Sequence, residues 1–174
     1  MICGMNLDDL RHALGGIVLE ASYMERALRA AFSVLMSSKY APVVDGHLST
    51  HNLIETCQHI VEVHTDISDG ARAQLAAALK DCMAANTKRN RVIHDAWALR
   101  PGDVVVTLKT VKTTQDVEVA ARTLPDLHQI ADDLGNAADE LAAAVAASFG
   151  PEGMSVEDEL RLELGHDIST DSGS

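Results

Sequence analysis

Apolar residues recur at three- and four-residue steps near the start of the chain, a spacing typical of a helix that buries one face. We expect this helix to run from about residue 7 to about residue 38, with Asn6 at the N-cap position. The adjacent pair Gly15 and Gly16 weakens the helix and predicts either a kink or a close helix crossing. The residues of the expected buried face are Leu10, Leu14, Ile17, Ala21, Met24, Leu28, Ala31 and Leu35.

Two further stretches with helical spacing follow in the middle of the chain. After a loop through "KYAPVVDGH", the segment "THNLIETCQHIVEV" predicts a shorter helix, and a third helix begins after "TDISDG". We expect the third helix to end near Arg100, because Pro101 and Gly102 come next. The positions expected to face inward are Leu53, Cys57, Ile60 and Val61 in the second helix, and Leu75, Leu79, Cys82, Asn86, Ile93 and Trp97 in the third.

The period of the pattern then changes from that of a helix to that of a strand. "VVVTLKT" and "DVEVAART" are rich in β-branched residues and are separated by a short polar link, which predicts a β-hairpin. The "TLPD" box starts a last main helix, which ends at Gly150 and buries Leu127, Ile130, Leu134, Leu141 and Val145.

The pattern as a whole predicts an all-α fold, a bundle of four main helices with a small β-hairpin insertion before the last one. We assign residues 1–150 to this helical domain. The polar segment 151–174 is expected to be a flexible acidic C-terminal tail.

Composition agrees with packed helices. Hydrophobic residues make up 47% of the chain but aromatic residues only 3%, whereas a β-sandwich is richer in aromatic and β-branched side chains. The three cysteines, Cys3, Cys57 and Cys82, show no CxxC spacing. The sequence shows no secretory signal and no apolar run near the roughly 18 residues of a membrane span. We therefore expect a cytoplasmic protein with reduced thiols and no membrane partner.

Charge is distributed unevenly along the chain. The formal net charge of -12 at pH 7 argues against a general nucleic-acid binder. Residues 151–174 alone account for a net charge of -6, however, whereas residues 86–112 carry a net charge of +4. The local basic region weakens the objection to a nucleic-acid ligand without removing it.

The stretch "ANTKRNRVIHDAW", residues 85–97, places polar side chains beside the apolar stripe of the third helix. With about 100° per residue and Leu75 at zero, Asn86, Asn90 and His94 form a ridge at about 20°, about 60° and about 100°, and Arg89 lies at about 320°. Arg89 and His94 are thus expected to bracket the buried face. Such side chains need partners, and three kinds fit: other groups in the fold, a second copy of the chain, or an anion such as phosphate.

The run "RNRVIHD" resembles the signature of HEPN domains, an Arg separated by four to six residues from a His, often with a polar residue directly after the Arg. Arg89 matches the Arg, Asn90 the polar residue and His94 the His. HEPN domains are helical bundles whose motif lies late in a long helix that is followed by one more helix. The expected elements have this order over about residues 7 to 148, and the acidic tail lies outside the resemblance.

The resemblance implies an activity and a set of partners. Many HEPN proteins are metal-independent endoribonucleases, often toxins of toxin–antitoxin or phage-defence systems, which dimerise so that two motifs face one cleft. The implied substrate is single-stranded RNA and the implied product a 2′,3′-cyclic phosphate. The implied protein partners are a second copy of the chain and an antitoxin or nucleotidyltransferase-type protein, and no cofactor is expected.

The same resemblance implies a catalytic role for each motif residue. His94 would accept the proton of the RNA 2′-hydroxyl or protonate the leaving 5′-oxygen, a task that imidazole performs well near neutral pH. Arg89 would hold the phosphate and stabilise its charge, and Asn90 would orient the imidazole or bond the phosphate. A non-catalytic interpretation stays open, in which a HEPN-like dimeric module binds a nucleotide or a partner protein through the same ridge.

Other candidate sites are weaker. His47 and His51 are four residues apart and His59 and His64 five, but neither pair has a carboxylate or thiolate at ligand spacing, so no metal site is expected. The sequence also lacks a GxSxG motif and a glycine-rich phosphate loop, which argues against hydrolase-fold and NTPase chemistry.

Three further side chains bear on the motif. Trp97 is expected to lie in the core under the motif and not to stack on a base, and its indole N–H needs an acceptor. Glu20 and Glu25 are expected on the solvated face of the first helix. One of them could reach the motif across the bundle, and the sequence does not select which.

Overall fold

The computed structural model describes residues 7–94, 96–100, 104–110 and 117–150, and most of these residues are helical. The expected N-cap Asn6, the thiol of Cys3 and the acidic segment 151–174 lie outside the described residues. The elements follow one another as α1 (Leu7–Met36), α2 (Ala41–Asp45), α3 (Thr50–Val63), α4 (Asp69–His94), β1 (Ala96–Arg100), β2 (Val104–Thr110), β3 (Val117–Ala121) and α5 (Leu124–Phe149).

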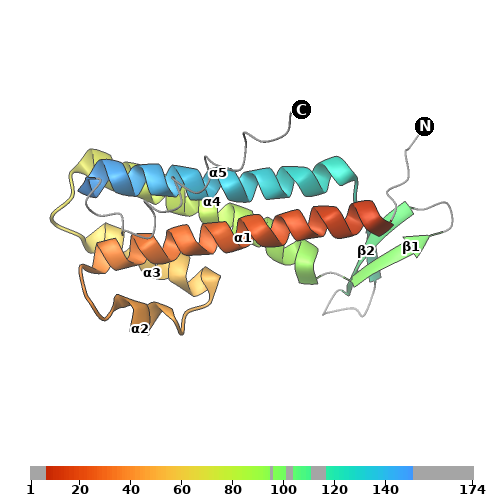
Figure 1. The fold of residues 1–174 in the computed structure, drawn as a ribbon, viewed down its shortest axis with the longest axis horizontal. Coiled ribbons are helices and arrows are strands. Elements are labelled where there is room, and N and C mark those ends of the chain that lie inside the picture. Colours follow the sequence, from red (N-terminus) through yellow and green to blue (C-terminus); the bar gives the residue numbers. More distant parts are fainter. Residues whose placement is uncertain (1–6, 95, 101–103, 111–116, 151–174) are drawn as a thin grey trace, which may run out of the picture.

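The four longer helices form a bundle that encloses one hydrophobic core. Figure 1 shows α1 and α5 side by side along most of their length, with α4 behind them and α3 below one half of α1. At 1.5 Å per residue, the 14 residues of α3 span about 21 Å, whereas the 30 residues of α1 span about 45 Å. Helix α3 therefore covers only one half of the bundle.

The expected helices α1, α3 and α5 are present, and the residues that bury their faces agree closely with the prediction. In α1 six of the eight expected residues are buried, and the other two, Leu14 and Ala21, pack partly buried against the core. All five expected core residues of α5 are buried. The predicted capping box is formed, because the Thr123 hydroxyl accepts from the Asp126 amide at 3.3 Å while the Asp126 carboxylate accepts from the Thr123 amide at 2.9 Å.

The expectation that the third helix reaches Arg100 is wrong. Helix α4 ends at His94, and Ala96–Arg100 forms strand β1. Strand β1 pairs antiparallel with β2, from Ala96 opposite Leu108 to Arg100 opposite Val104. Because β2 pairs with this segment through a ladder of hydrogen bonds, the segment adopts an extended conformation in spite of its local helical pattern.

Two smaller expectations are also corrected. The expected loop between the first two helices contains the one-turn helix α2, whose Asp45 is buried and pairs with Arg29 of α1 at 3.4 Å. Nothing comes within 4 Å of a Cβ built on Gly15 or Gly16, so no close crossing occurs there. At Gly135 of α5, by contrast, the Glu20 carboxylate of α1 lies 3.0 Å from such a Cβ.

The three strands form an antiparallel sheet with the order β1-β2-β3, and β2 pairs with β3 from Val106 opposite Ala121 to Thr110 opposite Val117. The sheet lies beyond the end of α4, near the N-terminal end of α1 (Figure 1). It adjoins the last turn of α4, which carries the HEPN-like motif. In the described part of the chain, no helix combines the length and the apolar character needed to cross a membrane.

Candidate nucleic-acid site at the end of α4

The side chain of Arg89 lies inside the buried arc of α4 and not at its edge. The buried residues of this helix occupy an arc from about 260° to about 40° on the wheel used above, and Arg89 at about 320° falls near its middle. The Arg89 side chain is accordingly partly buried, and its Nε is shielded from solvent without a hydrogen-bond partner among the described residues. The buried residues that define the arc are Leu75, Ala78, Leu79, Cys82, Ala85, Asn86 and Val92.

Contacts with α5 explain why the arc is shifted. The thiol of Cys82 points at the carbonyl of Ala137 at 3.6 Å, and Lys88 reaches Asp133 at 2.6 Å, both on α5. Helix α5 therefore buries a wider arc of α4 than the apolar stripe alone indicates, and Arg89 lies within that arc.

Arg89 and Asn90 contact one another directly. The Arg89 Nη1 donates a hydrogen bond to the Asn90 Oδ1 at 2.9 Å, and both side chains are partly buried. This bond fixes the amide of Asn90 and one edge of the guanidinium, and the other terminal nitrogen of Arg89 makes no hydrogen bond within the described part of the chain.

His94 is separate from this pair. It is the last residue of α4, its side chain is exposed, and no hydrogen bond or ion pair joins its imidazole to another described residue. The structure thus brings two of the three motif residues into contact and leaves the third one helical turn away at the surface. The expectation that Arg89 and His94 bracket the buried face is corrected, because Arg89 is partly buried within the arc and His94 is exposed.

Trp97 closes the end of α4 beneath the motif. Its indole N–H donates to the carbonyl of Val92 at 2.9 Å, and its ring packs partly buried against the core. This carbonyl belongs to the last turn of the helix, where no amide of the same helix can reach it. The Val92 carbonyl therefore supplies the acceptor that the indole N–H needs, and the hydrogen bond holds the last turn in place.

Beyond α3, no helix that the structure describes covers one side of the bundle next to the motif. Helix α3 begins at Thr50, whose hydroxyl donates to Glu25 of α1 at 3.4 Å. The side of α1 that carries Glu25 also carries residues nearer its N-terminus, and these have no α3 to pack against. Leu7 and Val18 are 42% and 47% exposed there.

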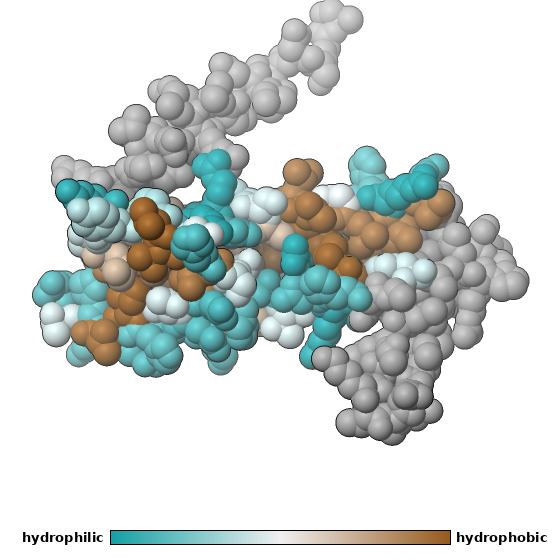
Figure 2. Space-filling view, turned by 90° about the horizontal axis from the view of Figure 1, so that it is seen from below, coloured by the Kyte–Doolittle hydropathy of each residue, from teal (hydrophilic) through white to brown (hydrophobic). Residues whose placement is uncertain are grey.

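The matching side of α4 carries two of the three motif residues. Asn90 and His94 lie on the side of the buried arc that faces away from α5. Helix α3 covers this side only nearer the N-terminus of α4. Seen from the α3 side, hydrophobic surface continues past the end of α3 toward the sheet (Figure 2). We call this region the open face and define it by Leu7, Leu14, Val18, Asn90, Ile93 and His94.

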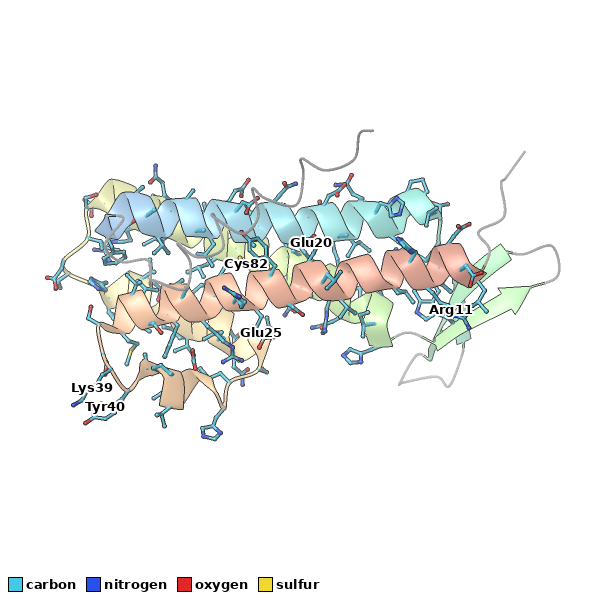
Figure 3. All side chains as sticks on the ribbon, viewed as in Figure 1. Arg11, Glu20, Glu25, Lys39, Tyr40 and Cys82 are labelled. Atoms are coloured by element: carbon cyan, nitrogen blue, oxygen red, sulfur yellow. The ribbon has the colours of Figure 1, made fainter. Side chains whose placement is uncertain are left out.

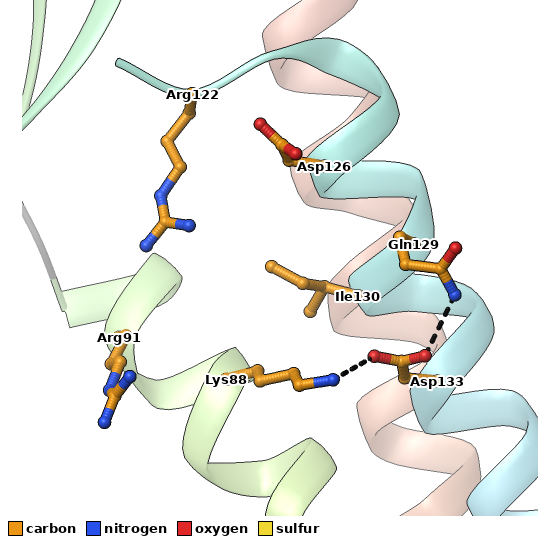
Figure 4. Close-up of a pocket in the computed structure, with 7 residues that line it drawn as sticks. All are labelled: Lys88, Arg91, Arg122, Asp126, Gln129, Ile130 and Asp133. Atoms are coloured by element: carbon orange, nitrogen blue, oxygen red, sulfur yellow. Dashed lines mark hydrogen bonds and ion pairs between the residues drawn. The ribbon is translucent and has the colours of Figure 1, made fainter. Parts of the chain in front are cut away.

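A pocket of about 240 Å³ lies on the other side of α4, between its last two turns and the first turns of α5. Its lining includes three cations and two carboxylates (Figure 4). The lining residues are Lys88, Arg91, Arg122, Asp126, Gln129, Ile130 and Asp133.

The two carboxylates of the pocket are already engaged. Lys88 bonds Asp133 at 2.6 Å, and Gln129 donates to its other oxygen at 3.0 Å. The hydrogen bond from Lys88 holds the pKa of Asp133 below its ordinary value. Asp126 belongs to the capping box, and its hydrogen bond to the Thr123 amide lowers its pKa as well.

The sequence interpretation missed this pocket. It placed Arg91 on the solvated side of α4, and that side chain is exposed. What it lacked was the position of Arg122, which precedes the N-cap of α5 and reaches toward the last turn of α4 (Figure 4). A basic residue just before a predicted cap is the one signal that could have pointed to it.

Neither acidic candidate on α1 reaches the motif. Glu25 pairs with Arg29 at 2.6 Å and receives the Thr50 hydroxyl, whereas Glu20 lies over Gly135 of α5 (Figure 3). The hydrogen bond to Glu25 raises the pKa of Arg29.

Histidines and cysteines elsewhere have other surroundings. His51 and His59 lie within ion-pair distance of Glu55 and Glu62 on exposed parts of α3. Among the residues that the structure describes, no three His, Cys, Asp or Glu side chains gather as they do around a metal ion. Burial raises the pKa of the Cys57 and Cys82 thiols to about 12.

We compared the chain with protein-family models, with curated proteins and with solved structures, and nothing matches it in any of the three.

Proposed function

We propose that the protein is a metal-independent endoribonuclease of the HEPN type, which cleaves single-stranded RNA with Arg89, Asn90 and His94. The observation that carries the proposal is the pairing of the Arg89 guanidinium with Asn90 at 2.9 Å beside an exposed imidazole one turn later. The hydrogen bond from Nη1 to Asn90 orients the guanidinium, and its other terminal nitrogen can then donate to a phosphate oxygen. The bundle, in which one more helix follows the motif helix after a small sheet, supports the HEPN-like fold in this proposal.

The proposed reaction uses the nucleophile of the RNA itself. His94 takes the proton of the 2′-hydroxyl as that oxygen attacks the adjacent phosphorus, or it gives a proton to the 5′-oxygen that leaves. Arg89 binds the oxygens that gain charge in the transition state, and Asn90 holds Arg89 in position. The bond to the 5′-oxygen breaks, and a 2′,3′-cyclic phosphate and a 5′-hydroxyl remain.

A second copy of the chain completes the proposed site. Each protomer contributes one motif histidine, whereas the reaction calls for one group that accepts a proton and another that donates one. The open face has the polar and apolar character of an interface, since Leu7 and Val18 are exposed around Asn90 and His94. A twofold axis through this face brings the same surface of both copies together, and with it both motifs.

The test is cleavage of a fluorescent single-stranded RNA by wild-type protein and by His94→Ala, with EDTA present throughout. We expect cleavage to fall at least about 100-fold in the variant, because general acid–base catalysis typically contributes that much. His59→Ala on α3 is the matched control and keeps wild-type activity. Mass spectrometry of the products should show the cyclic phosphate, and RNA with 2′-deoxy nucleotides should not be cut. Undiminished cleavage by His94→Ala would remove the assignment.

A non-catalytic binding module is the second candidate. The observation that favours it is that the Arg89 Nη1 already bonds Asn90 while its Nε is buried, so that fewer donors of the fork face outward. In that case the open face binds a partner protein, such as an antitoxin, or a nucleotide. A stable dimer that binds RNA or nucleotide but cleaves no single-stranded RNA would support this candidate over the enzyme.

A further inference from the structure

The pocket between α4 and α5 has an excess of positive charge, because three cations and two carboxylates line it. Lys88 and Asp133 neutralise each other at 2.6 Å, and Asp126 is held in the capping box of α5, where the hydrogen bond from Thr123 and the charge of Arg122 both lower its pKa. Arg91 makes no ion pair with any described residue, and the Nε of Arg122 is buried without a hydrogen-bond partner in the described part of the chain. A buried donor without a partner destabilises the fold, and a bound acceptor would remove that cost.

The chemistry of the pocket selects an oxyanion. Guanidiniums have five donors and no acceptor, so they bind phosphate or carboxylate oxygens and repel metal cations. The pocket volume of about 240 Å³ has room for a phosphate group with part of a sugar but not for a folded domain.

Arg91, which lines the pocket, is the residue of α4 that connects it to the proposed catalytic residue His94 around the surface of the helix. Lys88, Arg91 and His94 follow one another at three-residue steps, and residues three apart are neighbours on one side of a helix. Arg91 and His94 are separated by about 4.5 Å along the helix axis. A strand that passes His94 therefore meets Arg91 next and Arg122 behind it.

We propose that Arg91 and Arg122 form a subsite for a backbone phosphate of the RNA strand, adjacent to the phosphate that is cleaved. The subsite rests on the proposed ribonuclease function and adds to it the direction in which the strand leaves the motif. Contacts to backbone phosphates hold a strand in register and do not depend on its sequence. Loss of the subsite is therefore expected to weaken RNA binding while the chemical step at His94 continues.

The test uses a fluorescent single-stranded RNA made fully of 2′-O-methyl nucleotides, which cannot be cut by 2′-hydroxyl attack, so binding is read without cleavage. Its affinity is measured by anisotropy over a range of salt concentrations for the full chain. Arg91→Ala/Arg122→Ala should bind at least about 10-fold more weakly, and the slope of log K against log salt should become shallower by about 1.4, about 0.7 for each lost phosphate contact. Arg91→Lys/Arg122→Lys keeps the charges and should keep most of the slope.

The control is Lys39→Ala/Lys80→Ala, which removes two exposed positive charges elsewhere on the bundle. Thermal unfolding followed by circular dichroism verifies that each variant is folded. The subsite would be overturned if Arg91→Ala/Arg122→Ala and the control Lys39→Ala/Lys80→Ala gave the same salt slope. It would also be overturned if the wild-type protein failed to bind this RNA. The outcomes separate the two proposals. If the salt slope depends on Arg91 and Arg122 but ordinary RNA is not cleaved, the phosphate site is kept and the ribonuclease is rejected. If cleavage depends on His94 but the slope is unchanged in Arg91→Ala/Arg122→Ala, the ribonuclease is kept and the phosphate site is rejected.

Discussion

The candidate catalytic residue Arg89 is expected to destabilise the fold, because one of its hydrogen-bond donors is buried without a partner among the described residues. That donor is its Nε, whereas its Nη1 bonds Asn90 at 2.9 Å. A buried unsatisfied donor costs about 1–3 kcal/mol. This cost is one argument for the ligand role that we propose for Arg89.

The first prediction follows from that cost. Arg89→Met keeps most of the side-chain length but removes the unsatisfied donor, so we expect the free energy of unfolding to stay within about 1 kcal/mol of wild type or to rise, while RNA cleavage is lost. Urea unfolding measures the first quantity. Leu134→Ala is the reference for a structural residue and should lose about 2–5 kcal/mol. A comparable loss in Arg89→Met would show that Arg89 serves the fold.

The second prediction concerns the two buried thiols. Because burial raises the pKa of Cys57 and Cys82 to about 12, almost no thiolate forms at pH 8, and the thiolate is the reactive species. In a Cys3→Ser background, a thiol reagent at pH 8 should label neither cysteine in the native protein and both after addition of urea. Rapid labelling of the native protein would contradict the packing of α3 against α4 around them.

At the scale of elements, the sequence predicted best where one helix face meets the core. The residues of α1 and α5 repeat at three- and four-residue steps over many turns, and such patterns depend only on local order. The capping box at Thr123 is equally local and was predicted from "TLPD". By contrast, β1 forms because β2 pairs with it, and this tertiary contact overrides the helical pattern that continues into Trp97.

The candidate site was predicted only in part for the same reason. The motif residues could be read from one helix, and so could their order around it, but the inward position of Arg89 depends on how far α5 buries α4. The pocket between α4 and α5 brings α4 together with Arg122, which lies some thirty positions later in the chain. No local pattern contains that pairing.

The third prediction belongs to the link between α4 and α5. The hydrogen bond from Lys88 lowers the pKa of Asp133 in the folded protein, so the pair stabilises the fold above the unfolded pKa of about 4 and loses that effect as the pH falls through the folded value. Urea unfolding from pH 7 to pH 2.5 should show this acid-side loss in wild type and less of it in Asp133→Asn. The neighbouring exposed Asp132→Asn is the control and should follow the wild-type curve. Identical curves for Asp133→Asn and wild type would leave the ion pair without a role in stability.

At the scale of the whole molecule, the short helix α3 limits the surface on which the proposed partner can bind. It spans about half the length of α1, and the half that no described helix covers contains Asn90, His94 and exposed apolar side chains. A longer α3 would bury Asn90 and the region around His94 within the bundle. The open face is thus the consequence of the short α3, and a second copy of the chain is the occupant that we propose for it, because that copy would also supply a second histidine.

We propose that this face forms a shared catalytic cleft, and two neighbouring substitutions on α1 test that proposal. Val18 and Leu19 are 47% and 70% exposed, and the turn of about 100° per residue places Val18 on the open face and Leu19 away from it. Val18→Glu and Leu19→Glu place the same charge one residue apart, and each is examined by analytical ultracentrifugation and RNA cleavage over the same range of protein concentrations. The account predicts that Val18→Glu is monomeric and inactive, whereas Leu19→Glu is dimeric and cleaves RNA as wild type does. A monomeric Val18→Glu that cleaves at the wild-type rate would contradict it.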